Sequence, residues 1–221
     1  MPEFTLIIGN KNYSSWSLRA WLALKQAAVP FEEVRIPLHQ PNTDREILRY
    51  SPSGRVPLLI DGETKIWESI AICEYIAERL PKAHLWPEDA AARALARSVS
   101  AEMHAGFQAL RQNMPMNIRF KSQSKNIPAA VEDDVRRITS LWAGCRARYG
   151  RGGPFLFGHF TIADAMFAPI VCRFRTCGVP LDSVSKAYLD AVLALPAMKE
   201  WIEAAEKEIE QIPEYDQVGV K

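Results

Sequence analysis

Residues 55–69 read Arg-Val-Pro-Leu-Leu-Ile-Asp-Gly-Glu-Thr-Lys-Ile-Trp-Glu-Ser, and this stretch decides how the first part of the chain folds. Two apolar runs, residues 56–60 and 65–67, flank Asp61-Gly62. An Asp-Gly pair between two apolar runs is the strongest short-range signal for a β-hairpin. Glu68 and Ser69 then begin a helix that ends before Pro81, with an apolar face formed by Ile72, Cys73, Ile76 and Leu80. The stretch therefore predicts a strand–strand–helix unit.

The residues before this unit alternate between strand and helix patterns. Residues 4–8 and 31–36 are short apolar runs typical of strands, and residues 15–28 have helical periodicity that Pro30 ends. A further short helix is expected over residues 43–50. Because a crossover between parallel strands is right-handed, the first two strands are expected to be parallel, and the hairpin adds an antiparallel pair. The order predicts an α+β, thioredoxin-like domain over residues 1–81.

The pattern changes after a polar, proline-containing linker at residues 82–88. From residue 89 to residue 221 there is no convincing strand. Helical periodicity is found around residues 90–112, 129–149, 162–176, 186–194 and 197–211, separated by prolines at positions 128, 154, 180 and 196. We therefore expect an all-α helical bundle to follow the first domain.

Composition restricts the class of protein further. The chain has 221 residues, 48% of them hydrophobic and 24% charged, with a formal net charge of +1. A nucleic-acid partner is not expected, because such proteins show a basic excess. The first residues show neither a basic region nor a long apolar run, so a secretory signal is not expected, and no apolar run is long enough for a membrane span. Four cysteines without a CxxC pair or nearby histidines indicate free thiols, no metal site and a cytoplasmic location.

Three local patterns suggest a ligand site. Tyr13-Ser14-Ser15-Trp16-Ser17 lies where the first strand meets the first helix, and a helix N-terminus favours anions, although serines there are also ordinary caps. Pro57 begins a strand, where a cis bond would expose the backbone of Val56 to an extended peptide; an ordinary strand-starting proline is the alternative. Glu68 and Ser69 suit the ammonium and carboxylate of an amino acid, or form a simple cap.

A fourth pattern, Thr161 followed by Asp164, is a capping box with aspartate in the usual glutamate position, and its expected role is structural. In this order and at these spacings, the four patterns resemble the cytosolic glutathione transferases. The Ser14-Ser15 pair with Arg19 is most similar to the zeta class, although Trp16 replaces the cysteine of that class. The resemblance covers residues 5–80 closely and the helical half mainly through residues 161–164.

The resemblance implies roles for individual residues. Ser14 matches the catalytic serine, with Ser15, Ser17 and Tyr13 as alternatives for the group that contacts the sulfur. Arg19 matches a supporting residue, or forms a helix ion pair. The glutathione-binding set is Trp16, His39, Gln40, Arg55, Val56, Pro57, Glu68 and Ser69.

The expected chemistry is stabilisation of a thiolate. A cysteine-like thiol has a pKa of about 8.5, and only its thiolate is a good nucleophile. A hydroxyl donor and a helix N-terminus favour the charged form, and lowering the pKa by about two units needs about 2.7 kcal/mol. The second substrate is expected in the cleft between the domains, at Met103, His104, Phe107, Arg111, Met114 and Arg175. The methionines and the phenylalanine could instead belong to the helix core.

The expected partners are glutathione and a small apolar or carboxylated electrophile, in a homodimer that serves detoxification. Two other functions stay open. One is a glutathione-dependent cis–trans isomerase acting on a maleylacetoacetate-type diacid. The other is a binding or regulatory module that keeps the fold without the chemistry.

Overall fold

The computed structural model describes residues 3–121 and 127–216. A four-stranded mixed sheet forms the N-terminal domain, with the order β2-β1-β3-β4. Its strands are β1 (Phe4–Ile8), β2 (Phe31–Arg35), β3 (Leu58–Asp61) and β4 (Thr64–Trp67). Strand β1 is parallel to β2 and antiparallel to β3, and β3 and β4 form the hairpin. The predicted parallel pair and antiparallel hairpin are therefore confirmed.

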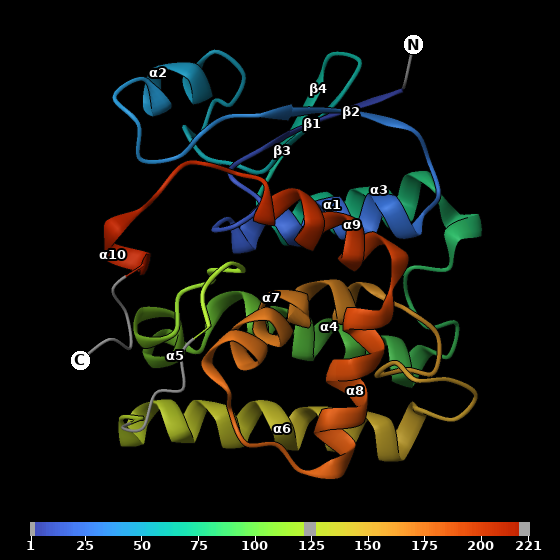
Figure 1. Ribbon diagram of the computed structural model, residues 1–221. Coiled ribbons are helices and arrows are strands. Elements are labelled where there is room, and N and C mark those ends of the chain that lie inside the picture. Colours follow the sequence, from blue (N-terminus) through green and yellow to red (C-terminus); the bar gives the residue numbers. More distant parts are fainter. Residues whose placement is uncertain (1–2, 122–126, 217–221) are drawn as a thin grey trace.

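Three helices cover the sheet. Helices α1 (Ser15–Gln26) and α3 (Ser69–Arg79) lie on the side that faces the helical domain, and α2 (Thr43–Leu48) lies on the opposite side (Figure 1). A small cluster of Ile7, Ile36, Ile47 and Leu58 seals α2 onto its face of the sheet. This layering places the N-termini of α1 and α3 at the same edge, where the strands end.

The C-terminal domain is helical, as the sequence predicts. It contains α4 (Ala90–Ala105), α5 (Gln108–Asn113), α6 (Ala129–Tyr149), α7 (Ile162–Cys177), α8 (Ser183–Ala194), α9 (Pro196–Glu206) and α10 (Pro213–Asp216). The described part of this domain has two isolated β-bridges and no longer strand. The limits 1–81 and 89–221 stay a prediction; a 3₁₀ turn, η1 (Pro81–Ala83), crosses the first of them.

Three helix predictions differ from the structure. The predicted helix at 90–112 is two helices, because Phe107 has a φ of 64° and interrupts the backbone after Gly106. Helix α8 begins earlier than expected, since the Asp182 carboxylate caps Val184 and Ser185. Helix α9 ends at Glu206 rather than near residue 211, and the following residues leave the bundle.

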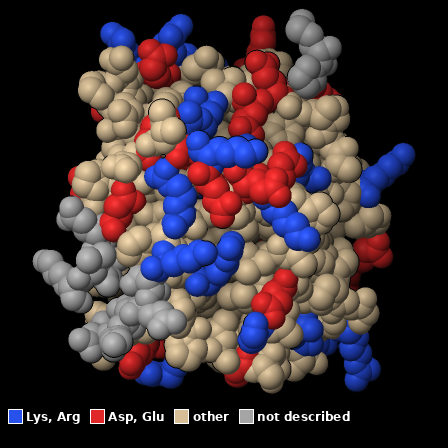
Figure 2. Space-filling view, viewed as in Figure 1, with Lys and Arg blue, Asp and Glu red and all other residues tan. Residues whose placement is uncertain are grey.

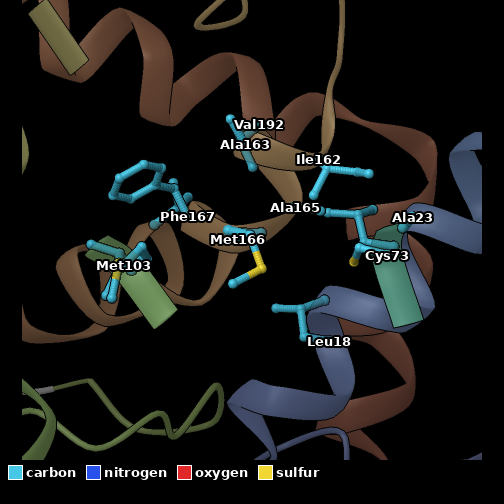
Figure 3. Packing of buried hydrophobic residues seen from close by; sticks show 14 of the residues in the cluster. Leu18, Ala23, Cys73, Met103, Ile162, Ala163, Ala165, Met166, Phe167 and Val192 are labelled. Carbon is cyan, nitrogen blue, oxygen red and sulfur yellow. The ribbon is translucent and has the colours of Figure 1, made fainter. Parts of the chain in front are cut away.

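Helix α7 is the centre of the molecule. All of residues 162–174 are buried, and the capping box at Thr161 and Asp164 begins the helix as predicted. Figure 3 shows Met166 of α7 close to Leu18 of α1, with Met103 of α4 on the other side. One contiguous apolar cluster runs from the sheet through α1, α3 and α7 to α9.

Residues 208–216 form a strap that returns from α9 to the N-terminal domain (Figure 1). The Glu208 carboxylate accepts hydrogen bonds from the backbone of Lys11 (2.7 Å) and Asn12 (3.0 Å). Arg119 donates to the carbonyls of Glu208 and Glu210.

Figure 2 shows acidic and basic side chains interspersed on the face viewed in Figure 1.

A tryptophan contact joins the two domains beside the strap. The rings of Trp21, from α1, and Trp201, from α9, have centroids 5.1 Å apart at an angle of 62°. The Lys11 ammonium lies over both rings, and the Lys11 carbonyl accepts a hydrogen bond from Trp201 Nε1 at 2.9 Å. The contact fixes α9 against α1.

Candidate active site

The loop before β3 supplies a backbone edge to the site. The Val56-Pro57 peptide bond is cis, as the sequence suggests. Within the described part of the chain, neither the N–H nor the C=O of Val56 makes a hydrogen bond. An extended peptide can therefore pair with Val56 as a strand pairs with a sheet edge.

A first cavity of about 380 Å³ opens beside this edge. Its walls come from the start of α1, the loop before β3, the start of α3 and the end of α4. The lining residues are Trp16, Ser53, Arg55, Val56, Pro57, Glu68, Ser69, His104 and Ala105. Five of the predicted glutathione-binding residues other than Trp16 thus share one cavity.

Glu68 and Ser69 present complementary groups to this cavity. Glu68 has a φ of 67° and lies just before α3, with its side chain 47% exposed. The Ser69 hydroxyl is buried and has no hydrogen-bond partner in the described structure. Since the first N–H groups of a helix also lack partners, the start of α3 is suited to a carboxylate while Glu68 is suited to a cation.

His104 reaches the same position from α4. Its Nε2 lies 3.4 Å from Oε2 of Glu68, and its Nδ1 is buried without a partner. Burial lowers the pKa of His104, and the charge of Arg19 lowers it further; Glu68 acts in the opposite direction, and Arg111 lowers it by a smaller amount. The neutral imidazole is therefore favoured at neutral pH.

The hydroxyls at the start of α1 differ in how they are bonded. Ser14 caps the helix: its oxygen accepts from the N–H of Ser17 at 3.3 Å, and its hydroxyl donates to Ser17 Oγ at 2.7 Å. Ser17 Oγ also accepts from the N–H of Gly9 at 3.1 Å, and Ser17 is fully buried. Ser15 lines a cavity, and its hydroxyl makes no hydrogen bond with the described residues.

The Tyr13 hydroxyl is already fully bonded. It donates to Asp216 at 2.9 Å and accepts from Arg119 at 2.9 Å and from the N–H of Ile212 at 3.2 Å. Burial raises the pKa of Tyr13. Its proton is held by the strap and is not available to a ligand.

A second cavity of about 230 Å³ shares Trp16 and Val56 with the first as lining residues. Two arginines, Arg111 and Arg173, line it, and no acidic side chain is among its lining residues. The full set is Tyr13, Ser14, Ser15, Trp16, Leu38, His39, Val56, Arg111, Pro115, Met116, Arg173 and Tyr215. The arrangement suits a small ligand that carries a carboxylate.

A third arginine, Arg19, lies over the ring of Trp16 and has no exposed surface. None of its guanidinium nitrogens has a hydrogen-bond partner in the described structure. Burial lowers the pKa of Arg19 well below its usual value, and the charges of Arg111 and Arg173 lower it further. Burial also lowers the pKa of Arg173, to about 10. The positive charge in and beside the second cavity is expected to attract anions.

Several predicted residues lie elsewhere. Gln40 is exposed and donates to the carbonyl of Leu38, outside both cavities. Met103, Phe107 and Met114 are buried in the core and line neither cavity, which matches the alternative reading of these residues as core. Arg175 is exposed; the arginine that lines the second cavity is Arg173, two positions earlier on α7.

Ser53, Arg173 and Tyr215 line the cavities but are not among the residues expected from the sequence. Tyr215 belongs to the strap, and its ring lies 5.9 Å from the rings of both Tyr13 and His39. Nothing in the sequence near residue 215 indicates a return to the first domain. Among the described residues, no group of three or more His, Cys, Asp or Glu side chains is arranged to hold a metal ion. No helix in the described ranges is both long and apolar enough to cross a membrane.

Comparison with known proteins agrees with this architecture. The family model "Glutathione S-transferase, N-terminal domain" matches residues 13–79, and "Glutathione S-transferase, C-terminal domain" matches residues 128–204. Maleylacetoacetate isomerase of Rattus norvegicus is 30% identical over 84% of this chain and 85% of its own length. Glutathione S-transferase Z2 of Arabidopsis thaliana is 24% identical over 86% of this chain and 88% of its own length.

Two further similar proteins differ in how much of this chain they match. Dichloromethane dehalogenase of Methylorubrum extorquens is 43% identical over 60 residues, which is 26% of this chain and 21% of that protein. A glutathione transferase homologue from Burkholderia, solved with bound glutathione, is 25% identical with a TM-score of 0.71, covering 94% of this chain and 100% of that one. The two family models and the relatives that match along most of their length identify the protein as a member of the glutathione S-transferase family.

Proposed function

We propose that the protein is a glutathione transferase that binds glutathione in the first cavity and transfers it to a small electrophile in the second. The observation that carries this proposal is the pairing at the start of α3. The unpartnered Ser69 hydroxyl and the Glu68 carboxylate lie side by side in one cavity, next to the unpaired backbone of Val56. These groups match the carboxylate, the ammonium and the peptide of a γ-glutamyl ligand.

The remaining glutathione contacts follow from this orientation. Arg55 lines the first cavity together with these groups and is kept as a glutathione contact, whereas His39 lines only the second cavity and is left out. Gln40 is left out of the proposal, because it lines neither cavity.

The reaction needs a thiolate at the start of α1. The thiol proton is released to solvent, the thiolate attacks the electrophile, a carbon–sulfur bond forms, and the leaving group departs with its electron pair. A hydroxyl that donates to the sulfur and the N-terminus of α1 both favour the anion. Together they are asked to supply about 2.7 kcal/mol for a pKa about two units lower.

Ser14 is the proposed donor by its position, and Ser15 is its rival by its bonding. Ser14 must give up its hydrogen bond to Ser17 Oγ before it can donate to sulfur. Ser15 has no such bond to break within the described chain and lines the second cavity. Ser17 and Tyr13 are less suited, because Ser17 is fully buried and the Tyr13 proton is directed to Asp216.

The experiment compares Ser14→Ala and Ser15→Ala with the wild-type protein by calorimetry and by the ultraviolet difference band of the bound thiolate. The variant that lacks the donor should keep glutathione affinity, show lower turnover and raise the thiol pKa by about one to two units, or about 1.4–2.7 kcal/mol. Ser98→Ala, at an exposed position of α4, is the control.

Two outcomes would contradict the proposal at different levels. If the wild-type protein takes up no glutathione, the assignment as a glutathione transferase fails. If glutathione binds but is not ionised and no electrophile reacts, the protein is a binding module that keeps the fold without the chemistry.

A second candidate reaction is the cis–trans isomerisation of a maleylacetoacetate-type diacid. The observation that favours it is the pair of arginines in the second cavity, which suits a carboxylate-bearing substrate. The isomerase of Rattus norvegicus is among the relatives matched along most of their length. Assays of a maleyl diacid and of carboxylated and neutral electrophiles, each with and without glutathione, separate the two reactions.

We also propose a homodimer in the cytoplasm. Trp67, at the end of β4, is 44% exposed and is an apolar group available for an interface. Trp86 is less suited, because its indole is held within the chain by Glu74 and Arg97. Light scattering of the purified protein measures the assembly directly.

A further inference from the structure

Trp16 is the side chain common to both cavities. The two sets of lining residues share only Trp16 and Val56 among the described residues, and Val56 contributes the backbone edge at the peptide. Trp16 is partly exposed, as expected for a ring with cavities beside it. A ligand that spans the two cavities must therefore pass this indole.

Charged groups from both domains hold the ring in place. The guanidinium carbon of Arg19, from α1, lies 4.3 Å from the ring centroid of Trp16, and that of Arg111, from α5, lies 4.8 Å from it. The His104 ring meets Trp16 edge-on at 5.1 Å. A guanidinium over an indole stabilises by about 0.5–1 kcal/mol at exposed sites and about 2 kcal/mol or more when desolvated.

The Arg19 contact belongs to the desolvated kind. Arg19 is fully buried, and its three side-chain nitrogens have no hydrogen-bond partner in the described structure. The π face of Trp16 is therefore a specific interaction that offsets part of the cost of burying this charge. Moving the indole aside would remove that interaction, so the ring resists displacement.

Arg111 is itself anchored to the end of α4. Its Nε donates to the carbonyl of Gly106 at 2.9 Å, and its Nη2 donates to the carbonyl of Met103. Cations bonded to the last carbonyls of a helix are well placed electrostatically. The indole thus contacts a buried arginine of the first domain and an arginine that is fixed at a helix end of the second.

We propose that Trp16 is a specificity-determining residue, a fixed partition that limits the width of the group attached to the glutathione sulfur. This inference rests on the proposed function, because it takes the first cavity as the glutathione site and the second as the electrophile site. The partition favours slim substituents that pass beside the indole over bulky aromatic ones.

The test measures affinity for product-like ligands, so it does not depend on turnover. Calorimetry gives the dissociation constants of glutathione, S-methylglutathione and S-benzylglutathione for the wild-type protein, Trp16→Phe and Trp16→Ala. Relative to wild type, the ratio of the S-benzyl to the S-methyl constant should fall about tenfold in Trp16→Ala and about threefold in Trp16→Phe. Trp16→Phe keeps a flat ring and reports on the partition if the alanine variant does not fold.

Trp86→Ala is the matched control, because Trp86 is also a largely buried indole with a guanidinium, that of Arg97, 5.5 Å from its ring. It lines neither cavity, so its ratio should equal that of wild type. An unchanged ratio in the Trp16 variants, or an equal change in Trp86→Ala, overturns the inference while glutathione binding still supports the proposed function. Absence of glutathione binding by the wild-type protein removes the proposed function and the inference together.

Discussion

Glu68 has two potential partners, the ammonium of a γ-glutamyl ligand and the imidazole of His104. The imidazole Nε2 is 3.4 Å from the carboxylate in the structure. A neutral imidazole shares the carboxylate with an incoming ammonium, whereas an imidazolium repels that ammonium and pairs with Glu68 itself. Arg19 and Arg111, which also face His104, add to the positive charge there.

Glutathione affinity should therefore fall in acid. The pKa of His104 is lowered, so the imidazolium forms only below the usual histidine range, and binding should stay constant near neutral pH and weaken by about tenfold, or about 1.4 kcal/mol, once His104 is protonated. Calorimetry across this range measures the effect.

Two histidine-to-asparagine variants test this prediction: His104→Asn removes the group that titrates, and His84→Asn is the control. His104→Asn should abolish the part of the pH dependence that lies below the usual histidine pKa of about 6.5. His84→Asn removes an equivalent histidine–glutamate pair, His84 with Glu88 at 3.0 Å, outside both proposed binding cavities, and should leave the profile unchanged. A wild-type profile in His104→Asn would mean that another group titrates.

At the scale of single elements, the start of α7 depends on one buried carboxylate. Asp164 accepts hydrogen bonds from the N–H of Leu156 (3.1 Å) and from the N–H and hydroxyl of Thr161 (2.8 Å and 3.0 Å). In Asp164→Asn an amide donor replaces one acceptor, so donors are left facing each other. The free energy of unfolding in urea should fall by about 2–4 kcal/mol.

Asp182→Asn is the matched control, since asparagine caps a helix as well as aspartate does. Asp182 caps α8 at a largely exposed position, and its replacement should lower the free energy of unfolding by only about 0.3 kcal/mol. Equal losses in the two variants would show that the capping box does not determine the stability of the bundle.

The pH dependence of the Asp164 contribution has a definite sign. Burial raises the pKa of Asp164 to about 6, above its usual 3.8. Between these values the folded state binds more protons than the unfolded state, so this group's contribution to stability falls as pH rises. The difference in free energy of unfolding between wild type and Asp164→Asn should therefore shrink as the pH rises from about 4 to about 6.

The capping box at residues 161–164 and the Asp-Gly hairpin could be predicted because each depends on a few neighbouring side chains. The face of α7 could not. Residues 162–174 are buried on every side of the helix, so hydrophobic periodicity does not indicate which face points to the substrate. For this reason the sequence predicts Arg175 at the second substrate, whereas Arg173 lines the second cavity. Likewise, the break at Gly106 follows from the positive φ of Phe107, which no local residue pattern demands.

The residues of the first cavity are easier to bring together from the sequence than those of the second. Glu68, Ser69 and Val56 lie within one strand–strand–helix unit, so their spacing along the chain fixes their relative positions. The second cavity combines residues from the start of α1, from α5, from α7 and from the strap. Such a set depends on how separate helices pack, and sequence spacing does not contain that information.

In the molecule as a whole, the strap ties the two domains together and contributes Tyr215 to the second cavity. The Glu208 side chain is only 6% exposed and bonds the backbone N–H groups of Lys11 and Asn12. Glu208→Ala leaves both donors without a partner, and the free energy of unfolding should fall by about 1–3 kcal/mol. The nearby exposed Glu206→Ala should change it by less than about 0.5 kcal/mol.

The same variant should affect the second substrate more than glutathione. Tyr215 lines the second cavity but not the first, so loosening the strap should raise the KM of the electrophile and leave the glutathione dissociation constant nearly unchanged. Equal effects on both ligands would indicate that the strap supports the entire site.

The contact between Trp21 and Trp201 gives the protein an internal optical reporter of its own assembly. Two indoles at 5.1 Å and 62° are held in a chiral arrangement, and each ring comes from a different domain. Their transitions should couple and give a near-ultraviolet circular dichroism signal that exists only while α9 rests on α1. Loss of that signal before the helical far-ultraviolet signal would reveal a state in which the two halves have parted but each keeps its secondary structure.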